Sequence, residues 1–225
     1  MIKLVVFDWN GVLIADTQAV VDIDNQLLKR YGRKPITVRQ YREIFTMPVI
    51  DFFYALGFGK EEMRKESIII QNLFHSLYEP RIAKLRTRAG ARELLEFLAE
   101  HNIESIILSN HTKEGIQSQL QRLRLESYFS SFITNDIHTT MQRKNKAEKL
   151  VDLVKKSRYT REQILIIGDS PEETEAGRLA GVKTVGITGG YYSEKRLAAA
   201  KPEYLIHKLT DMISIVKAEL TRQNP

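Results

Sequence analysis

Acidic side chains follow two of the apolar segments that have strand character in this sequence. Asp8 comes directly after Leu4–Phe7, and Asp169 follows Ile164–Ile167 after one glycine, with Glu173 four residues later. Ligands collect at the carboxyl ends of parallel strands, so these carboxylates are expected to lie together. Carboxylate oxygens suit Mg²⁺, and such a metal could offset the charge of a phosphate group. Taken alone, Asp8 could equally cap a turn.

Hydroxyl, amide and ammonium groups elsewhere in the chain could bind the phosphate itself. Ser109 and Asn110 follow the apolar run Ser105–Leu108. The Ser109 hydroxyl can donate to a phosphate oxygen, and amides at a following helix start could do the same. A serine that only caps a helix is the alternative. Lys144 or Lys146, at the start of a helical segment, could neutralise phosphate charge, or both could be solvated surface residues.

Short apolar runs alternate with amphipathic helical segments over most of the chain. Runs that are continuously apolar suit strands buried on both faces. The alternation therefore predicts an α/β fold with a doubly wound, Rossmann-like parallel sheet. The predicted strands are Leu4–Phe7, Ser105–Leu108, Phe132–Thr134, Ile164–Ile167, Thr184–Ile187 and Tyr204–Ile206. The predicted helices around them are Gly90–His101, Lys146–Lys156, Pro171–Ala180 and Thr210–Leu220.

One interval, residues 16–85, interrupts this alternation because its periodicity is helical throughout. The sequence predicts a small α-helical cap domain over residues 16–85, inserted after the first strand, and a core domain made of residues 1–15 and 86–225. The helices predicted in the cap are Ala19–Tyr31, Val38–Phe45, Ile50–Leu56 and Glu61–Tyr78.

Composition narrows the classes of partner. The net charge is +6, but the basic residues are scattered among acids, so we expect no nucleic-acid binding and a mild preference for small anionic substrates. No apolar run reaches membrane-spanning length, and the first residues do not form a signal peptide, so no membrane association is expected. The absence of cysteine excludes disulfides and thiolate sites, and a cytoplasmic location is predicted.

Together these segments resemble the four ordered motifs of the haloacid-dehalogenase-like superfamily. Asp8–Leu13 is similar to the first motif, Ser109 to the second, Lys146 or Lys144 to the third, and Gly168–Glu173 to the fourth. The register favours Lys146, whereas Lys144 fits another variant of the pattern. The resemblance spans about residues 3–209, and the helical insert lies where phosphoglycolate-phosphatase-like members place their cap.

The resemblance implies an enzyme, a phosphatase of small phosphorylated metabolites with Mg²⁺ as its cofactor. Asp8 would attack phosphorus and form an aspartyl-phosphate that water hydrolyses. The metal would be held by the Asp8 carboxylate, the Asn10 backbone carbonyl and Asp169, while Glu173 would orient its water ligands. The groups implied to hold the phosphoryl group are Ser109, Asn110 and Lys146 or Lys144.

Asn10 departs from the family pattern, in which an Asp protonates the leaving oxygen and then activates water. An amide can do neither, and losing general acid–base catalysis typically slows a reaction by ~10²–10⁴-fold. The substrate could have a good leaving group, as acyl and aryl phosphates do, or His111 or a cap residue could supply the proton. Deamidation at Asn10-Gly11 could also generate Asp. Alternatively, the protein could be a slow or inactive regulatory protein that binds a phosphorylated ligand.

The Asp8-Trp9 start is also similar to phosphonoacetaldehyde hydrolases, which cleave a carbon–phosphorus bond. Those enzymes form a Schiff base with a cap lysine, but the corresponding stretch here, Phe45–Val49, contains none. Dehalogenation is disfavoured too, because metal-independent dehalogenases would leave Asp169 and Glu173 without a role.

Overall fold

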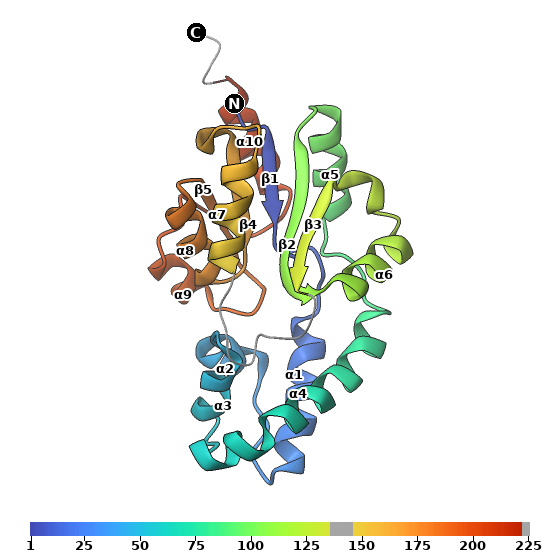
Figure 1. The fold of residues 1–225 in the computed structure, drawn as a ribbon, viewed down its shortest axis with the longest axis vertical. Helices are drawn as coiled ribbons and strands as arrows, with labels where there is room; N and C mark the ends of the chain where they lie inside the picture. Colours follow the sequence, from blue (N-terminus) through green and yellow to red (C-terminus); the bar gives the residue numbers. More distant parts are fainter. Residues whose placement is uncertain (136–145, 222–225) are drawn as a thin grey trace.

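A parallel sheet forms the centre of the molecule (Figure 1). The computed structural model describes residues 1–135 and 146–221. The six strands lie in the order β3-β2-β1-β4-β5-β6. Their bounds are β1 (Leu4–Phe7), β2 (Glu104–Thr112), β3 (Ser131–Asn135), β4 (Ile164–Gly168), β5 (Lys183–Ile187) and β6 (Tyr204–Ile206).

The central strands β2, β1 and β4 run side by side in parallel up to the last residue of β1. Phe7 of β1 lies opposite Ile107 of β2 and Ile167 of β4. The residues that follow these positions, Asp8 among them, therefore emerge at one edge of the sheet, where ligands bind in open α/β folds.

Helices cover both faces of the sheet. They are α5 (Ala91–Glu100), α6 (Lys113–Leu123), α7 (Lys146–Lys156), α8 (Pro171–Ala180), α9 (Glu194–Ala199) and α10 (Asp211–Thr221). Successive side chains of a strand point to opposite faces. Val5 and Phe7 accordingly pack in one apolar cluster with α5, α6 and α10. Leu4 and Val6 pack in a second cluster with α7 and α8. The predicted doubly wound α/β fold is confirmed.

Four helices follow β1 and lie beyond the carboxyl edge of the sheet. They are α1 (Thr17–Arg30), α2 (Val38–Ile44), α3 (Val49–Ala55) and α4 (Lys60–Ile82). In Figure 1 the arrow of β1 points toward them. α1 packs along α4, and Tyr41 of α2 lies edge-to-face with Phe52 of α3 at 5.2 Å between ring centroids. The predicted helical insertion after the first strand is confirmed, and we call α1–α4 the cap helices.

Most predicted elements match the structure within two residues at each end, and two helices were not predicted. α6 begins with polar residues and contains Gly115, which weakens its helical pattern, and α9 is a short helix. Two short 3₁₀ helices, Glu126–Tyr128 and Arg161–Gln163, precede β3 and β4. None of the helices in the described residues is both long and apolar enough to cross a membrane.

Candidate active site

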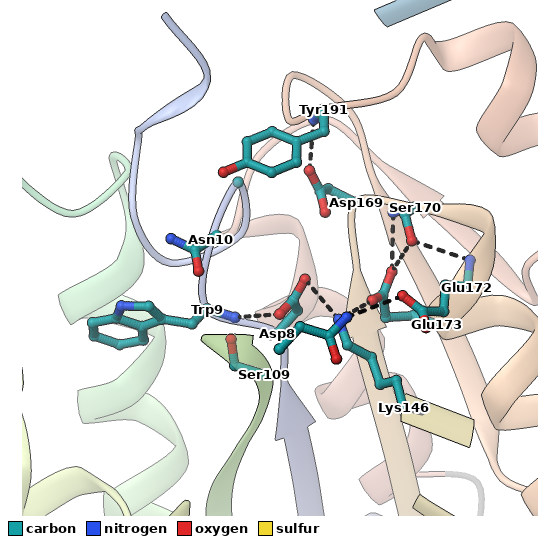
Figure 2. Close-up of polar contacts among 12 residues, drawn as sticks. Asp8, Trp9, Asn10, Ser109, Lys146, Asp169, Ser170, Glu172, Glu173 and Tyr191 are labelled. Carbon is teal, nitrogen blue, oxygen red and sulfur yellow. Dashed lines mark hydrogen bonds and ion pairs between the residues drawn. The ribbon is translucent and has the colours of Figure 1, made fainter. Parts of the chain in front are cut away.

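Three carboxylates and one lysine gather at the carboxyl edge of the sheet (Figure 2). Carboxylate oxygens of Asp8, Asp169 and Glu173 lie within 4.8 Å of one another. The Lys146 Nζ lies 3.1 Å from Asp8 Oδ2 and also pairs with Glu173. Of the two predicted lysines, the structure thus places Lys146 beside Asp8, and Lys144 lies outside the described residues.

These charges strongly influence one another because all four groups are buried. Burial raises the pKa of Asp8 to about 7, although the nearby Lys146 ammonium lowers it. Burial also raises the pKa of Asp169 well above its usual range, and the charges of Asp8 and Glu173 add to this. For Lys146, burial lowers the pKa, but the neighbouring carboxylates outweigh it and hold that pKa well above its ordinary value. One ammonium cannot balance three carboxylates, so a divalent cation would favour their ionised forms.

Two glycines leave room for the Asp169 side chain. A Cβ on Gly11 or on Gly190 would overlap Asp169 Oδ2, and Gly11 also has a φ of +72°. The same carboxylate oxygen accepts a 2.6 Å hydrogen bond from the Tyr191 amide. The Asp169 carboxylate is therefore fixed between two backbone segments, which sets its direction toward Asp8.

Glu173 is fixed from its own helix. The Ser170 hydroxyl donates to Glu173 Oε2 at 2.6 Å, and the Ser170 amide donates to the same oxygen at 3.1 Å. This is a capping box at the start of α8, which accounts for the spacing of the two residues. The other carboxylate oxygen of Glu173, Oε1, pairs with Lys146. Glu173 therefore positions the lysine as well as adding charge to the cluster.

Ser109 lies beside Asp8 on an extended segment. β2 continues to Thr112 with an irregular register after Leu108, and it is Thr112 that caps α6 by accepting from the Gly115 amide. The alternative that Ser109 caps a helix is therefore wrong, and the helix expected after it begins at Lys113. Its hydroxyl accepts a 3.1 Å hydrogen bond from the His111 amide and is buried at the site.

Asn110 lies on the same segment at the rim of the carboxylate cluster. Its amide nitrogen donates to Glu172 Oε2 at 3.4 Å, and its backbone carbonyl accepts from Asn135 at 2.9 Å. The side chain faces the same cavity as Asp8. Binding of phosphate by Ser109 and Asn110 remains a prediction, now with both groups at the site.

Asn10 belongs to a buried hydrogen-bond network centred on Asp16, which was not predicted. The Asn10 amide donates to Asp16 Oδ2 at 3.0 Å and to the Tyr78 hydroxyl at 2.6 Å. The Tyr78 and Tyr191 hydroxyls donate to the same Asp16 oxygen at 2.7 and 2.6 Å, and the Gly11 amide donates to Oδ1 at 2.9 Å. Burial raises the pKa of Asp16, whereas these hydrogen bonds lower it. The network joins the first loop to α4 and to the loop after β5.

A cavity of about 170 Å³ connects this edge of the sheet with the cap helices. Asp8, Lys146 and Ser109 line one part of it, and aromatic side chains from α2, α3 and α4 line the other. His111 also lines it, with Nε2 3.3 Å from Gln119 Nε2, and the Trp9 indole donates to the Gln119 carbonyl. Trp9 is completely buried and packs edge-to-face against Phe129, with 6.4 Å between ring centroids.

Asp24 of α1 lines the apolar part of the cavity, and burial raises its pKa to about 8. Between its ordinary pKa of 3.8 and about 8, the folded protein holds a proton that the unfolded chain releases, so stability falls as pH rises. Asp24→Asn is therefore expected to raise the melting temperature progressively from pH 4 to pH 8 and to leave it unchanged below that interval. Asp22→Asn, on the outer face of the same helix, is the control; the same pH trend in both variants would contradict the assignment.

Comparisons with known proteins agree with this geometry. The family model for haloacid dehalogenase-like hydrolases matches residues 5–187. A phosphoglycolate phosphatase of Pseudomonas fluorescens is 27% identical over 94% of this chain and 78% of its own length. One of Synechococcus elongatus is 26% identical over 98% of this chain and all of its own. A haloacid dehalogenase-like hydrolase structure from Streptococcus pneumoniae covers 96% of this chain and 98% of its own, with a TM-score of 0.79 at 19% identity.

The family match includes the segments that carry Asp8, Ser109, Lys146 and Asp169. It extends from the first strand to the end of β5, with the cap helices inside it. The chain therefore belongs to the haloacid dehalogenase-like hydrolase family.

Proposed function

We propose that this chain is a Mg²⁺-dependent phosphatase that hydrolyses a small phosphorylated metabolite through an aspartyl-phosphate on Asp8. The observation that carries the proposal is the position of the Asp8 carboxylate at the end of β1, 3.1 Å from the Lys146 ammonium and within 4.8 Å of two further carboxylates. The phosphoglycolate phosphatases to which the chain is similar support a phosphoric monoester hydrolase.

The reaction would proceed in two displacements at phosphorus. An oxygen of Asp8 attacks phosphorus while the bond to the leaving oxygen breaks, and the phosphoryl group is then carried by Asp8. Water attacks the same phosphorus, the bond to Asp8 breaks, and inorganic phosphate leaves. Lys146 and Ser109 would hold the phosphoryl oxygens, which carry most of the charge in the transition state.

The donor set at this site suits a hard divalent cation. Asp8 and Asp169 would hold Mg²⁺ with the Asn10 backbone carbonyl, and Glu173 would orient water ligands. The bound metal would offset phosphoryl charge. The excess of buried negative charge over the single Lys146 ammonium supports this fit.

The leaving oxygen needs another proton source, because the Asn10 amide is not an acid, and it donates to Asp16 and Tyr78. We propose that the substrate has a leaving group that needs little protonation, or that the His111 ring, which lines the cavity, supplies the proton. The engaged Asn10 amide also favours the second candidate, a weakly active or inactive regulatory protein that binds a phosphorylated ligand. Carbon–phosphorus cleavage is disfavoured, because the described lining of the cavity includes no lysine from the cap helices.

The metal requirement gives a direct test with acyl and aryl phosphates. Turnover is expected to disappear with a chelator and to return on titration with Mg²⁺. Gly190→Ala should raise the Mg²⁺ concentration for half-maximal turnover by roughly 10-fold or more, because its Cβ would displace Asp169. Gly59→Ala is the control, since its Cβ meets nothing within 4 Å. Phosphate binding without turnover at any Mg²⁺ concentration would favour the regulatory role.

A further inference from the structure

The cap end of the cavity has an apolar wall made largely of aromatic rings. Several of these rings contact one another edge-to-face, as Phe45 and Phe52 do at 5.3 Å between centroids. Apolar and aromatic walls bind the apolar part of a ligand through burial of its surface. The wall consists of Val20, Tyr41, Phe45, Met47, Val49, Phe52, Phe53, Ile70 and Phe74.

Two buried polar groups at this end of the cavity, the Tyr41 hydroxyl and the Asp24 carboxyl, make no hydrogen bond within the described residues. The Tyr41 hydroxyl is completely buried and has no partner there. The Asp24 side chain is 4% exposed and likewise makes no hydrogen bond or ion pair in that part of the chain. Asp24 of α1 and Tyr41 of α2 line the same cavity. A buried polar group without a partner destabilises a fold, so a ligand that pairs with both would account for them.

The described lining of this end of the cavity carries little positive charge. Among its described lining residues, the cap helices contribute His75 but no lysine or arginine. A carboxylate placed there would meet aromatic faces, which carry negative potential, and the Asp24 carboxyl. The leaving group of phosphoglycolate carries such a carboxylate, so this end of the cavity favours an uncharged group over it.

We propose that the cavity takes a phosphate monoester whose alcohol part is an apolar body of aromatic-ring size, with an uncharged hydrogen-bonding group such as a hydroxyl placed against Asp24 and Tyr41. This inference rests on the proposed function, because it orients the phosphate toward Asp8 and Lys146. The whole cavity, including its end at Asp8 and Lys146, measures about 170 Å³. Because a cavity of roughly 150 Å³ holds benzene, the alcohol part can be no larger than about one ring. With its pKa raised by burial to about 8, Asp24 is protonated at neutral pH and can both donate to and accept from a hydroxyl.

Binding of phosphonates, which cannot be hydrolysed at the ester position, tests the inference without turnover. The probes are benzylphosphonate, its para-hydroxymethyl derivative and phosphonoacetate, measured by calorimetry with Mg²⁺ at pH 7. The hydroxymethyl derivative is expected to bind roughly 5-fold tighter than benzylphosphonate, the gain typical of a hydrogen bond. Phosphonoacetate should bind more weakly than either.

Variants test whether the tighter binding of the hydroxymethyl derivative comes from Tyr41 and Asp24. Tyr41→Phe and Asp24→Leu should each remove most of the preference for the hydroxymethyl derivative, so that its affinity falls toward that of benzylphosphonate in the same variant. Asp24→Asn should keep most of it, because an amide also donates and accepts. Asp22→Asn on the outer face of α1 is the matched control and should behave as the unchanged protein.

Three results would overturn the inference: tighter binding of phosphonoacetate than of benzylphosphonate, an unchanged hydroxymethyl preference in both Tyr41→Phe and Asp24→Leu, or no binding of either aryl probe. These results are separate from failure of the proposed function. If the protein binds the probes as expected but hydrolyses no ester, the inference about the cavity stands and the proposed phosphatase function is wrong. If the protein hydrolyses phosphoglycolate and binds phosphonoacetate more tightly than the aryl probes, the phosphatase function stands and the inference about the cavity is wrong.

Discussion

Asp8→Asn is expected to lower kcat by roughly 10⁴-fold or more, because an amide is a poor nucleophile toward phosphorus and no phosphoryl-enzyme then forms for water to hydrolyse. The change is nearly isosteric. The amide oxygen can still accept the 2.7 Å hydrogen bond from the Trp9 amide, and Lys146 keeps Glu173 as its partner. The measurement is turnover of an aryl phosphate at saturating Mg²⁺, and unchanged turnover would falsify the assignment of Asp8 as nucleophile.

Asp8→Asn should keep its fold. In the absence of metal it should be more stable than the unchanged protein between pH 4 and pH 7. Burial raises the pKa of Asp8 from 3.8 to about 7, so the folded state retains a proton that the unfolded chain has released. Stability contributed by that protonated carboxyl is lost as pH rises through this interval, and an uncharged amide does not lose it. The melting temperature of Asp8→Asn relative to the unchanged protein should therefore rise between pH 4 and pH 7. A lower melting temperature at pH 7 would show that Asp8 is needed structurally.

Trapping of the aspartyl-phosphate would show directly that Asp8 is the nucleophile. Acid-quenched protein taken during turnover should yield an Asp8-containing peptide that carries one phosphate, and Asp8→Asn should yield none. Asp22→Asn, which changes a carboxyl outside the cavity, should retain both turnover and the labelled peptide. Turnover with no phosphopeptide under rapid quenching would indicate direct attack by water.

The parts of the site that could be predicted are those encoded locally. A short apolar run that ends in an acid specifies both a buried strand and a carboxylate at its end, so Asp8 and Asp169 were placed correctly relative to the sheet. Lys146 begins a helix whose apolar residues define its inward face, which also fixes the lysine at the sheet edge. These positions follow from strand and helix geometry and need no knowledge of distant contacts.

The parts that could not be predicted depend on contacts between distant segments. Asp16 accepts hydrogen bonds from Tyr78 and Tyr191, and no local pattern links an acid before a helix to tyrosines in two other segments. The clue was an acid within the apolar–helix junction Ala15-Asp16-Thr17. Likewise, periodicity shows that Asp24 and Tyr41 lie on helices but does not show that they border one cavity. Cavity shape arises from packing of several helices, which one sequence leaves open.

Asn10→Asp is expected to raise kcat by roughly 10²- to 10³-fold on alkyl phosphates, whose leaving oxygen needs a proton, and by less on aryl phosphates. The structure explains why the carboxyl at position 10 would hold the proton that the leaving oxygen needs. Asn10 Nδ2 lies 3.0 Å from Asp16 Oδ2, so a carboxyl at position 10 would share a proton with Asp16. Two carboxyls at such a distance cannot both ionise, and the pair would keep one proton near neutral pH. The variant should therefore carry an acid ready to protonate the leaving oxygen.

A second substitution tests whether the rate gain comes from the acid at position 10 and not from some other improvement of the site. In Asn10→Asp combined with Asp16→Asn, the carboxyl at position 10 no longer shares a proton, so its pKa should fall and the rate optimum should move to lower pH. The gain on alkyl phosphates at pH 7 should shrink accordingly. Peptide mapping of the starting protein must show Asn at position 10, so that deamidation does not mask the effect. If neither ester class gains in the single variant, the missing proton carrier is not what limits turnover, and the site is specialised for binding or for a substrate that needs no acid.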